Sequence, residues 1–312
     1  MSQSIAFRLP STRLDAAFDG PQLTSDGGLC WLSEADAALG LCAALAAHIP
    51  EWRHRSARHS LETLVRQRVF QIACGYEDQD DAGTLWVTLR HDPLLKLVCG
   101  RLPDEADLAS QPTLSRLENA VDCKACYRLA LAMVHLYLRE RERDGIPQRI
   151  VLDLDGTDDP AHGKQEGVAY HGFYNQYMYH PLLIFDGDTG QLITAVLRPG
   201  TCHASRGALA VIKRLVRLLR ARWPGVTIEV RGDSGFAVPA LYDYLDEQHI
   251  PYTIALGRNP RLEAMAAALA EQATRERAET GEKVRLFDQG QYQADSWEHE
   301  RRVVYLRRIT RC

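Results

Sequence analysis

Through the first half of the chain, apolar residues recur every three or four positions, which is the spacing of an amphipathic helix. After Ser60, a good N-cap residue, one predicted helix face collects Leu61, Leu64, Val65, Val69, Ile72 and Ala73. We expect this helix to end at Gly75. Helical spacing begins near Ser25, and a last run over 127–144 stops at the break 145–147. The pattern predicts an all-helical segment that closes at Pro147.

Beyond Pro147 the pattern changes to short apolar runs separated by turn residues, which is typical of strands. In chain order it predicts strands at 149–155, 181–186 and 191–197, a helix at 206–222, a strand at 226–231, a helix after Pro239 and a strand at 252–256. The turn residues 187–190 make a β-hairpin of the second and third strands. This order predicts an α/β fold with a mixed sheet, the layout of a ribonuclease H-like core, although many α/β folds share it.

Three parts follow from these patterns. Residues 1–20 lack periodicity and are expected to form an N-terminal arm, residues 21–146 a helical domain, and residues 147–312 the mixed-sheet domain. The composition, 46% hydrophobic and 25% charged, is that of an ordinary globular protein. No signal-like N-terminus and no apolar run of about 18 residues is present, so a cytoplasmic protein without a membrane partner is expected.

The formal charge of -4 argues against a uniformly basic nucleic-acid coat but permits local basic faces. The eight cysteines are scattered, which favours reduced thiols over a disulfide framework. Cys123 and Cys126 form a lone C-x-x-C, and a zinc site would need two more ligands nearby. We therefore interpret them as ordinary helix residues.

Three aspartates lie at or near the ends of predicted strands. Asp153 and Asp155 lie two residues apart, so their side chains share one face of the strand, and Asp155 is at its exit. Carboxylates in an apolar strand are costly, and bound metal cations are one natural compensation. Asp233 ends a second strand before Ser234. Because ligands collect at the carboxyl ends of strands, Asp155 and Asp233 could share a metal site.

Each of these aspartates also has a purely structural interpretation. Asp153 or Asp155 could cap the turn at 156–160, and Asp233 could be the N-cap of the next helix.

Several long motifs together resemble a known family. They are LTSDGG at 23–28, RQRVFQIACGYED at 66–78, SQPTLSRLEN at 110–119, LDLDGTDDP at 152–160 and RGDSGF at 231–236. In this order they resemble the transposases of the insertion sequence 1380 family, within the group-1 DDE domain. The resemblance extends from about residue 20 to 305.

The resemblance implies a ribonuclease H-like core in which two aspartates and a glutamate hold two Mg²⁺ ions, with Mn²⁺ as an alternative. By motif position Asp155 is the first aspartate and Asp233 the second, with Asp153 as an alternative first. It implies cleavage and strand transfer at the terminal inverted repeats of a bacterial element, with target DNA as the second partner. The helical domain would serve DNA binding or assembly, and the protein would be a homo-oligomer on DNA.

The sequence departs from this family in one respect. Relatives carry the glutamate in a later motif, Tyr-x-x-Arg-Gly-x-x-Glu-Asn, which the 312 residues lack. No glutamate between Glu263 and Glu300 is distinguished as a substitute. We therefore expect a C-terminally truncated copy, and a truncated DNA-binding inhibitor of transposition without catalysis is an alternative.

Two basic clusters add candidate DNA contacts. On the predicted helix at 206–222, the cations are Arg206, Lys213, Arg214, Arg217, Arg220 and Arg222. They lie opposite an apolar face and could bind phosphates, or could form a solvated face. A second cluster, which could contact the ends of an element or be plain surface, contains Arg53, His54, Arg55, Arg58 and His59.

A different enzyme class shares the segment at 153–157. Its pattern D-x-D-G-T matches the nucleophile motif of haloacid dehalogenase-like phosphatases. Those enzymes also resemble one another in a later Gly-Asp-x-x-x-Asp motif, where this chain has Ala237. In addition, an antiparallel hairpin is predicted where a parallel crossover would be expected. The phosphatase interpretation is thus the weaker one.

Overall fold

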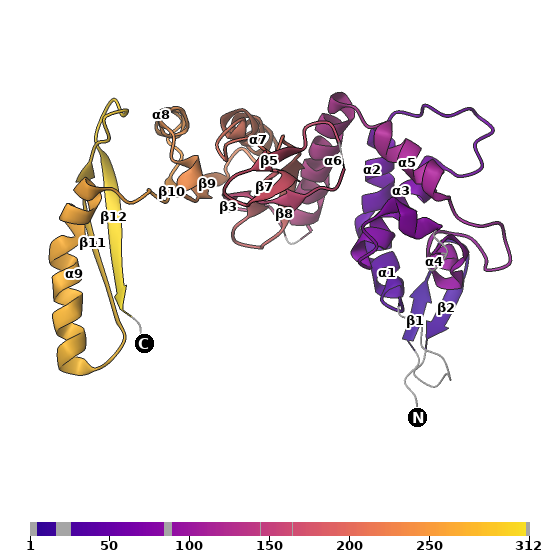
Figure 1. The fold of residues 1–312 in the computed structure, drawn as a ribbon, viewed down its shortest axis with the longest axis horizontal. Helices are drawn as coiled ribbons and strands as arrows, with labels where there is room; N and C mark the ends of the chain where they lie inside the picture. Colours follow the sequence, from indigo (N-terminus) through magenta and orange to yellow (C-terminus); the bar gives the residue numbers. More distant parts are fainter. Residues whose placement is uncertain (1–4, 17–25, 84–88, 144, 164, 310–312) are drawn as a thin grey trace. The chain divides into compact units, whose positions relative to one another are not determined.

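The computed structural model describes residues 5–16, 26–83, 89–143, 145–163 and 165–309 (Figure 1). Ser25, expected at the start of the helical segment, lies outside these ranges. The chain forms two compact units. The first comprises Met1–Pro147 and Thr157–Gly200, and the second comprises Gln148–Gly156 and Thr201–Cys312. Among the described helices, none alone has the length and apolar character to cross a membrane, although α1 (Leu29–Leu39) and α2 (Leu41–His48), bent by 64°, meet both criteria as a pair.

Helices make up most of the first unit up to residue 141. They are α1 (Leu29–Leu39), α2 (Leu41–His48), α3 (Leu61–Ala73), α4 (Pro93–Val98), α5 (Gln111–Asn119) and α6 (Cys123–Arg141), with 3₁₀ turns η1 (Gln79–Ala82) and η2 (Leu89–His91). Side-chain caps define several starts: Asp92 accepts from the backbone N–H of Leu95, and Asp122 from that of Ala125, both at 2.7 Å. Gly40, with φ 63°, separates α1 from α2.

Helix α3 begins as predicted, because the Ser60 hydroxyl accepts from the backbone N–H of Thr63 at 3.0 Å. Its last residue is Ala73, just before Gly75 at φ 88°. The predicted face is partly wrong, since Ile72 is 49% exposed. The buried positions are Leu64, Val65, Gln67, Phe70 and Gln71. The large ring of Phe70 packs in the core, and this turns the buried face away from Ile72.

Two buried glutamines on α3 have opposite surroundings. The Gln67 amide donates to the carbonyl of Ala109 at 3.0 Å and accepts from its N–H at 2.9 Å. The Gln71 side chain is equally buried, yet in the described part of the chain neither of its amide atoms has a hydrogen-bond partner. The amide of Gln67 therefore satisfies a buried peptide group, while burial of the Gln71 amide costs solvation free energy that no hydrogen bond compensates.

We expect Gln67→Met to lower the free energy of unfolding by about 1–3 kcal/mol, because the buried peptide groups of Ala109 lose their partner. Gln71→Met should leave that free energy unchanged or raise it, since an unpaired amide is replaced by an apolar side chain of similar volume. Urea denaturation of both variants measures the difference. Equal losses would show that the hydrogen bonds of Gln67 do not distinguish the two sites.

The first unit also contains strands, not all of which were predicted. Within the expected N-terminal arm, whose residues showed no periodicity, the chain forms a hairpin of β1 (Ile5–Arg8) and β2 (Arg13–Ala16). A small sheet in the order β4-β6-β5 also had no sequence signal; it contains β4 (Asp159–Pro160), β6 (Gln176–Tyr179) and β5 (Ala169–His171). The predicted hairpin is confirmed as antiparallel β7 (Leu182–Asp186) and β8 (Leu192–Val196). Helix α6 packs against β8.

A buried carboxylate fastens this hairpin to α6. Asp186, at the end of β7, is fully buried, and the hydroxyl of Tyr137 donates to its Oδ2 at 2.8 Å. The guanidinium Nε of Arg141 lies 3.4 Å from the same oxygen. The second oxygen accepts from the backbone N–H of Asp188 at 3.1 Å. Burial, followed by the contact with Asp186, raises the pKa of Tyr137, so the phenol remains a donor.

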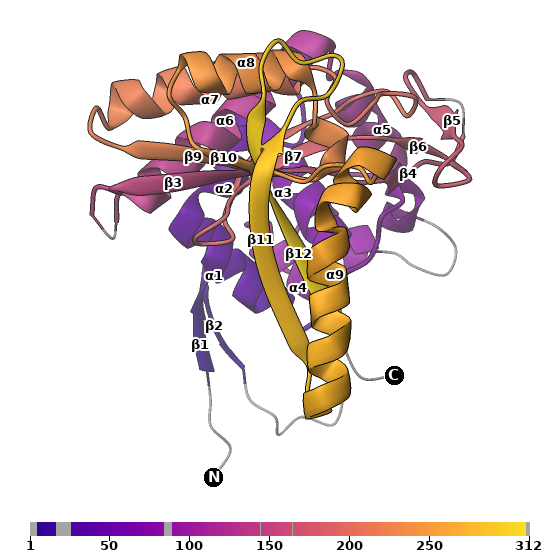
Figure 2. The ribbon, with the colours of Figure 1, turned by 90° about the vertical axis from the view of Figure 1, so that its left-hand side faces the viewer.

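The second unit contains the parallel strands β3 (Arg149–Gly156), β9 (Thr227–Gly232) and β10 (Tyr252–Ile254). Helices α7 (Ala208–Arg222) and α8 (Pro239–Glu247) follow the order predicted from the sequence, and α7 runs alongside β3 and β9 (Figure 2). In hydrogen-bonded order the mixed sheet reads β10-β9-β3-β7-β8. The α/β class with a mixed sheet is therefore confirmed.

The end of the chain forms elements that the sequence did not predict. Helix α9 (Pro260–Thr280) packs on the antiparallel pair β11 (Val284–Tyr292) and β12 (Arg301–Ile309), coloured orange to yellow in Figure 1. Asn259 caps α9 by accepting from the backbone N–H of Leu262 at 3.0 Å. Tyr292 and Trp297 join Tyr242 of α8 in one core cluster, which ties this segment into the unit.

Candidate metal centre

Strands β3 and β9 have one apolar and one charged face. The apolar face is buried and contains Ile150, Leu152, Leu154, Ile228 and Val230. Alternation along each strand puts the residues between them on the opposite face. From the start of the strands to their ends, the charged residues there are Arg149, Asp153 and Asp155 on β3, and Glu229 and Arg231 on β9, with Asp233 just after it.

Opposite charges pair along most of this charged face. Arg149 donates through Nε and Nη2 to the two oxygens of Glu229, both at 2.8 Å. These hydrogen bonds lower the pKa of Glu229. Next along the strands, the guanidinium of Arg231 forms an ion pair with Asp153. Both acids are therefore already neutralised by arginines.

The last two acids of this face lack such partners. Each residue of β3 pairs with the residue of β9 that is 78 positions later in the sequence, from Arg149 with Thr227 to Leu154 with Gly232. Asp233 is likewise 78 positions after Asp155. Both side chains are exposed, and in the described part of the chain neither forms an ion pair. Since adjacent strands lie about 4.8 Å apart, continuing the pairing by one residue would bring two like charges close together, which is unfavourable unless a cation compensates them.

Asp233 also has a structural role. Its Oδ1 accepts from the backbone N–H of Gly235 at 2.8 Å and so caps the 3₁₀ turn η3 (Ser234–Phe236). The predicted N-cap is thus present, although it belongs to this turn; α8 starts later, at Pro239. A side chain at position 235 would bring its Cβ within 2.7 Å of the Ala204 Cβ and 3.0 Å of the Asp233 carboxylate. The cap fixes one carboxylate oxygen and leaves the other for a ligand.

The carboxylates fit a hard divalent cation in their donor chemistry. Mg²⁺ prefers oxygen ligands and commonly takes one or two carboxylates together with water and substrate phosphates. Asp155 makes no hydrogen bond within the described part of the chain, so it does not cap the turn that follows, and its oxygens are available. Asp153 is held by Arg231, a partner that sequence reasoning did not identify. Over the described residues, no group of three His, Cys, Asp or Glu side chains could enclose a metal.

The basic residues of α7 are on its solvent side. Its buried positions include Ile212, Leu215, Val216 and Leu219, and the exposed cations are Lys213, Arg214, Arg217, Arg220 and Arg222. Arg206 is exposed but precedes the helix, which starts two residues later than predicted. Lys213 Nζ lies 5.0 Å from the Tyr244 ring centroid, and Arg220 donates to Gln248 at 3.0 Å.

Arg214 and Arg217 differ from these neighbours. Within the described residues, their guanidinium groups form neither a hydrogen bond nor an ion pair. Both cations are therefore available for an external anion.

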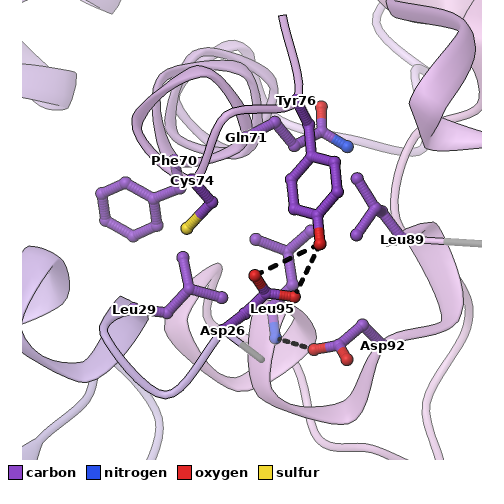
Figure 3. A pocket seen from close by; sticks show the side chains of 9 residues that line it. All are labelled: Asp26, Leu29, Phe70, Gln71, Cys74, Tyr76, Leu89, Asp92 and Leu95. Atoms are coloured by element: carbon purple, nitrogen blue, oxygen red, sulfur yellow. Dashed lines mark hydrogen bonds between the residues drawn. The ribbon is translucent and has the colours of Figure 1, made fainter. Parts of the chain in front are cut away.

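A small hollow in the helical part does not present reactive groups (Figure 3). It is lined by Asp26, Leu29, Phe70, Gln71, Cys74, Tyr76, Leu89, Asp92 and Leu95. Tyr76 donates to the two oxygens of Asp26 at 3.1 and 3.3 Å, and Asp92 caps α4. Burial raises the pKa of the Cys74 thiol, which keeps it protonated. These groups stabilise the fold.

Comparisons with known proteins identify one family. The family model described as "Transposase DDE domain group 1" matches residues 8–311. A solved structure of the piggyBac transposase synaptic complex with hairpin DNA shares 14% identity, with a TM-score of 0.33 over 88% of this chain and 51% of that one. The chain therefore spans about half the length of that transposase. No curated protein matches.

Proposed function

Because the chain belongs to the group-1 transposase DDE domain family, we propose that it cleaves and joins DNA strands at the terminal inverted repeats of a bacterial insertion sequence of the 1380 family. Transposases of this kind act on DNA and use divalent metal ions. The observation that carries the proposal is the pair of acids, Asp155 and Asp233, at equivalent positions on neighbouring strands without a cationic partner in the described part of the chain. We expect Mg²⁺ there, with Mn²⁺ as a substitute.

In this proposal each charged residue has a separate task. Asp155 and Asp233 would hold the metal ions, and the chemistry that such ions would supply is activation of a water or a DNA 3′-hydroxyl and stabilisation of the leaving oxygen. The backbone N–H of Gly235 orients the carboxylate of Asp233. Arg231 keeps Asp153 engaged, which makes Asp155 the better candidate for the first acid. Arg214 and Arg217 on α7, with Lys213, Arg220 and Arg206 beside them, would bind the DNA backbone.

The remaining features of the proposal concern architecture. We propose a ribonuclease H-like core after residue 147, a helical DNA-binding or assembly domain over 21–146 and an arm over 1–20. The mixed sheet, with three parallel strands and one hairpin, supports the first of these. We further propose that the protein acts in the cytoplasm as a homo-oligomer assembled on element ends and target DNA.

The phosphatase interpretation of residues 153–157 loses support. One transposase family model accounts for residues 8–311, whereas that interpretation rests on five residues. The phosphatase nucleophile would be Asp153, and an arginine already occupies it. An aspartate engaged in a tight ion pair is a poorer nucleophile than a free carboxylate.

A DNA-binding protein without catalysis is a second candidate. It is favoured by one observation: over the described residues no third acid is grouped with Asp155 and Asp233. The exposed cations of α7 would serve this function equally well.

A gel-shift and nicking assay separates the two candidates. We expect the chain to shift a duplex carrying the ends of its element without divalent ions, because phosphate contacts do not need the metal. With Mg²⁺, denaturing gels should then reveal a nicked strand. A shift without nicking would favour the non-catalytic candidate, and the absence of a shift would contradict both.

A further inference from the structure

The loop between α2 and α3, residues 49–60, is exposed and strongly basic, and the metal centre does not account for it. Its charged and titratable residues are Glu51, Arg53, His54, Arg55, Arg58 and His59. We call this segment the basic loop. The loop contains one acid and three arginines, so it has a local positive charge although the whole chain has a net negative charge.

Two arginines anchor the basic loop. Arg53 donates to the Glu51 carboxylate at 2.7 Å and to the carbonyl of His59 at 2.6 Å. From outside the loop, Arg101 donates to the carbonyl of Arg58 at 3.3 Å and lies 3.0 Å from the Nδ1 of His59. Arg101 is itself fixed by two further bonds of 2.9 Å to the carbonyls of Ala106 and Asp107. The planar fork of a guanidinium suits such simultaneous contacts.

The other two arginines are exposed and unengaged. Arg55 is in a turn closed by the backbone N–H of Ala57, which donates to the carbonyl of His54 at 2.9 Å. In the part of the chain that the structure describes, the side chains of Arg55 and Arg58 form no hydrogen bond, ion pair or ring contact. Arg101 holds the carbonyl of Arg58, and the turn from His54 to Ala57 holds the backbone at Arg55, so ordering this backbone upon binding would cost little entropy.

His59 responds to the charge around it. Burial is the largest cause that lowers the pKa of His59, and with the charges of Arg101, Arg58 and Arg53 it lowers this pKa to about 4. Its imidazole is therefore neutral at neutral pH, and three neighbouring cations produce a positive potential at this point of the surface. An approaching anion would be attracted to that potential.

We propose that Arg55 and Arg58 of the basic loop bind phosphates of duplex DNA, as a contact separate from the arginines of α7. The inference rests on the proposed function, because a transposase must hold a long segment of DNA around the scissile phosphate. The fork of arginine matches phosphate oxygens in geometry and charge. Such contacts position the duplex without reading its sequence.

Fluorescence anisotropy with a labelled random-sequence duplex tests the proposal. The double variant Arg55→Gln, Arg58→Gln should weaken binding about ten-fold at roughly physiological salt, given two surface charge contacts. The slope of log affinity against log salt concentration should fall by about 2, close to one for each arginine removed. Thermal melting should not change, because both side chains are exposed.

Two comparisons make the result specific. The variant Arg8→Gln, Arg13→Gln removes the same charge from exposed positions of the β1–β2 hairpin and should keep the wild-type slope. Arg214→Gln, Arg217→Gln should weaken binding through α7. If the α7 variant weakens binding and the loop variant matches the Arg8/Arg13 control, the loop faces another partner and the inference is wrong. If the wild-type chain does not bind duplex DNA, the proposed function itself fails.

Discussion

Asp155→Asn and Asp233→Asn are each expected to reduce Mg²⁺-dependent nicking by at least about a thousandfold, a loss of about 4 kcal/mol in transition-state stabilisation. The neutral amide removes one of two adjacent negative charges that would hold the cation. In Asp233→Asn the amide oxygen would still accept from the backbone N–H of Gly235, so the turn cap is retained. DNA binding without divalent ions should stay equal or improve slightly, because repulsion of phosphate is reduced.

Asp153→Asn is the matched control. Asp153 lies on the same face, one residue pair earlier, but Arg231 neutralises it. We expect nicking to stay within about ten-fold of wild type, and the freed arginine to leave the metal ligands intact. Loss of nicking in Asp153→Asn together with retention in Asp155→Asn would make Asp153 the first acid.

Metal binding supplies a readout that does not depend on nicking. A ligand that binds the folded state stabilises it, by about 2.7 kcal/mol at a concentration of 100 Kd. Mg²⁺ should therefore raise the melting temperature of the wild-type chain, and either acid variant should abolish that rise. The same variants should melt at or above the wild-type temperature without Mg²⁺, since a like-charge contact has been removed.

Asp186→Ala should lower the free energy of unfolding by about 3–5 kcal/mol, because it leaves a largely buried cation without its counter-ion. The carboxylate is fully buried, accepts from Tyr137 at 2.8 Å and lies 3.4 Å from Arg141. Tyr137→Phe removes only one hydrogen bond to a charged group and should cost about 1.5–3 kcal/mol. Urea denaturation followed by tryptophan fluorescence measures both.

Thr189→Ala in the same turn is the comparison for Asp186→Ala. Thr189 is exposed, and its hydroxyl accepts only a 3.3 Å hydrogen bond from the N–H of Gln191. We expect a change within about 0.5 kcal/mol. If Asp186→Ala were no more harmful than Thr189→Ala, the buried carboxylate would not be what fastens the hairpin to α6.

The sequence was sufficient to predict those features in which a residue's role depends on its near neighbours along the chain. Ser60 caps α3 because its hydroxyl reaches an N–H three residues ahead, and the hairpin of β7 and β8 follows from four turn residues between two apolar runs. The placement of Asp155 at the end of one apolar strand and of Asp233 just after another was also evident from the sequence. That their two strands are neighbours was also expected from the sequence, whereas the register between the strands, an offset of 78 positions, required the structure.

Other features depended on distant partners and had no usable local signal. The hairpin of β1 and β2 is only four residues per strand, and it forms where Phe7 joins the core of the helical segment. Phe70 and Ile72 both have apolar side chains, and only the tertiary packing decides which one is buried. The two strands carry the opposite charges that form the ion pair of Asp153 with Arg231. That these two residues meet could be predicted only with knowledge of the strand order and register.

The alternation of arginine and acid along β3 and β9 has a consequence for alignment. Sliding β9 by two residues along β3 would set Asp153 against Glu229, and sliding it by one would turn its charged side chains into the apolar layer. The ion pairs earlier in the two strands thus favour a single register of β9 against β3. If the same register continues by one residue, it brings Asp155 and Asp233 together, and the ion pairs earlier in the two strands would then offset the repulsion between these acids.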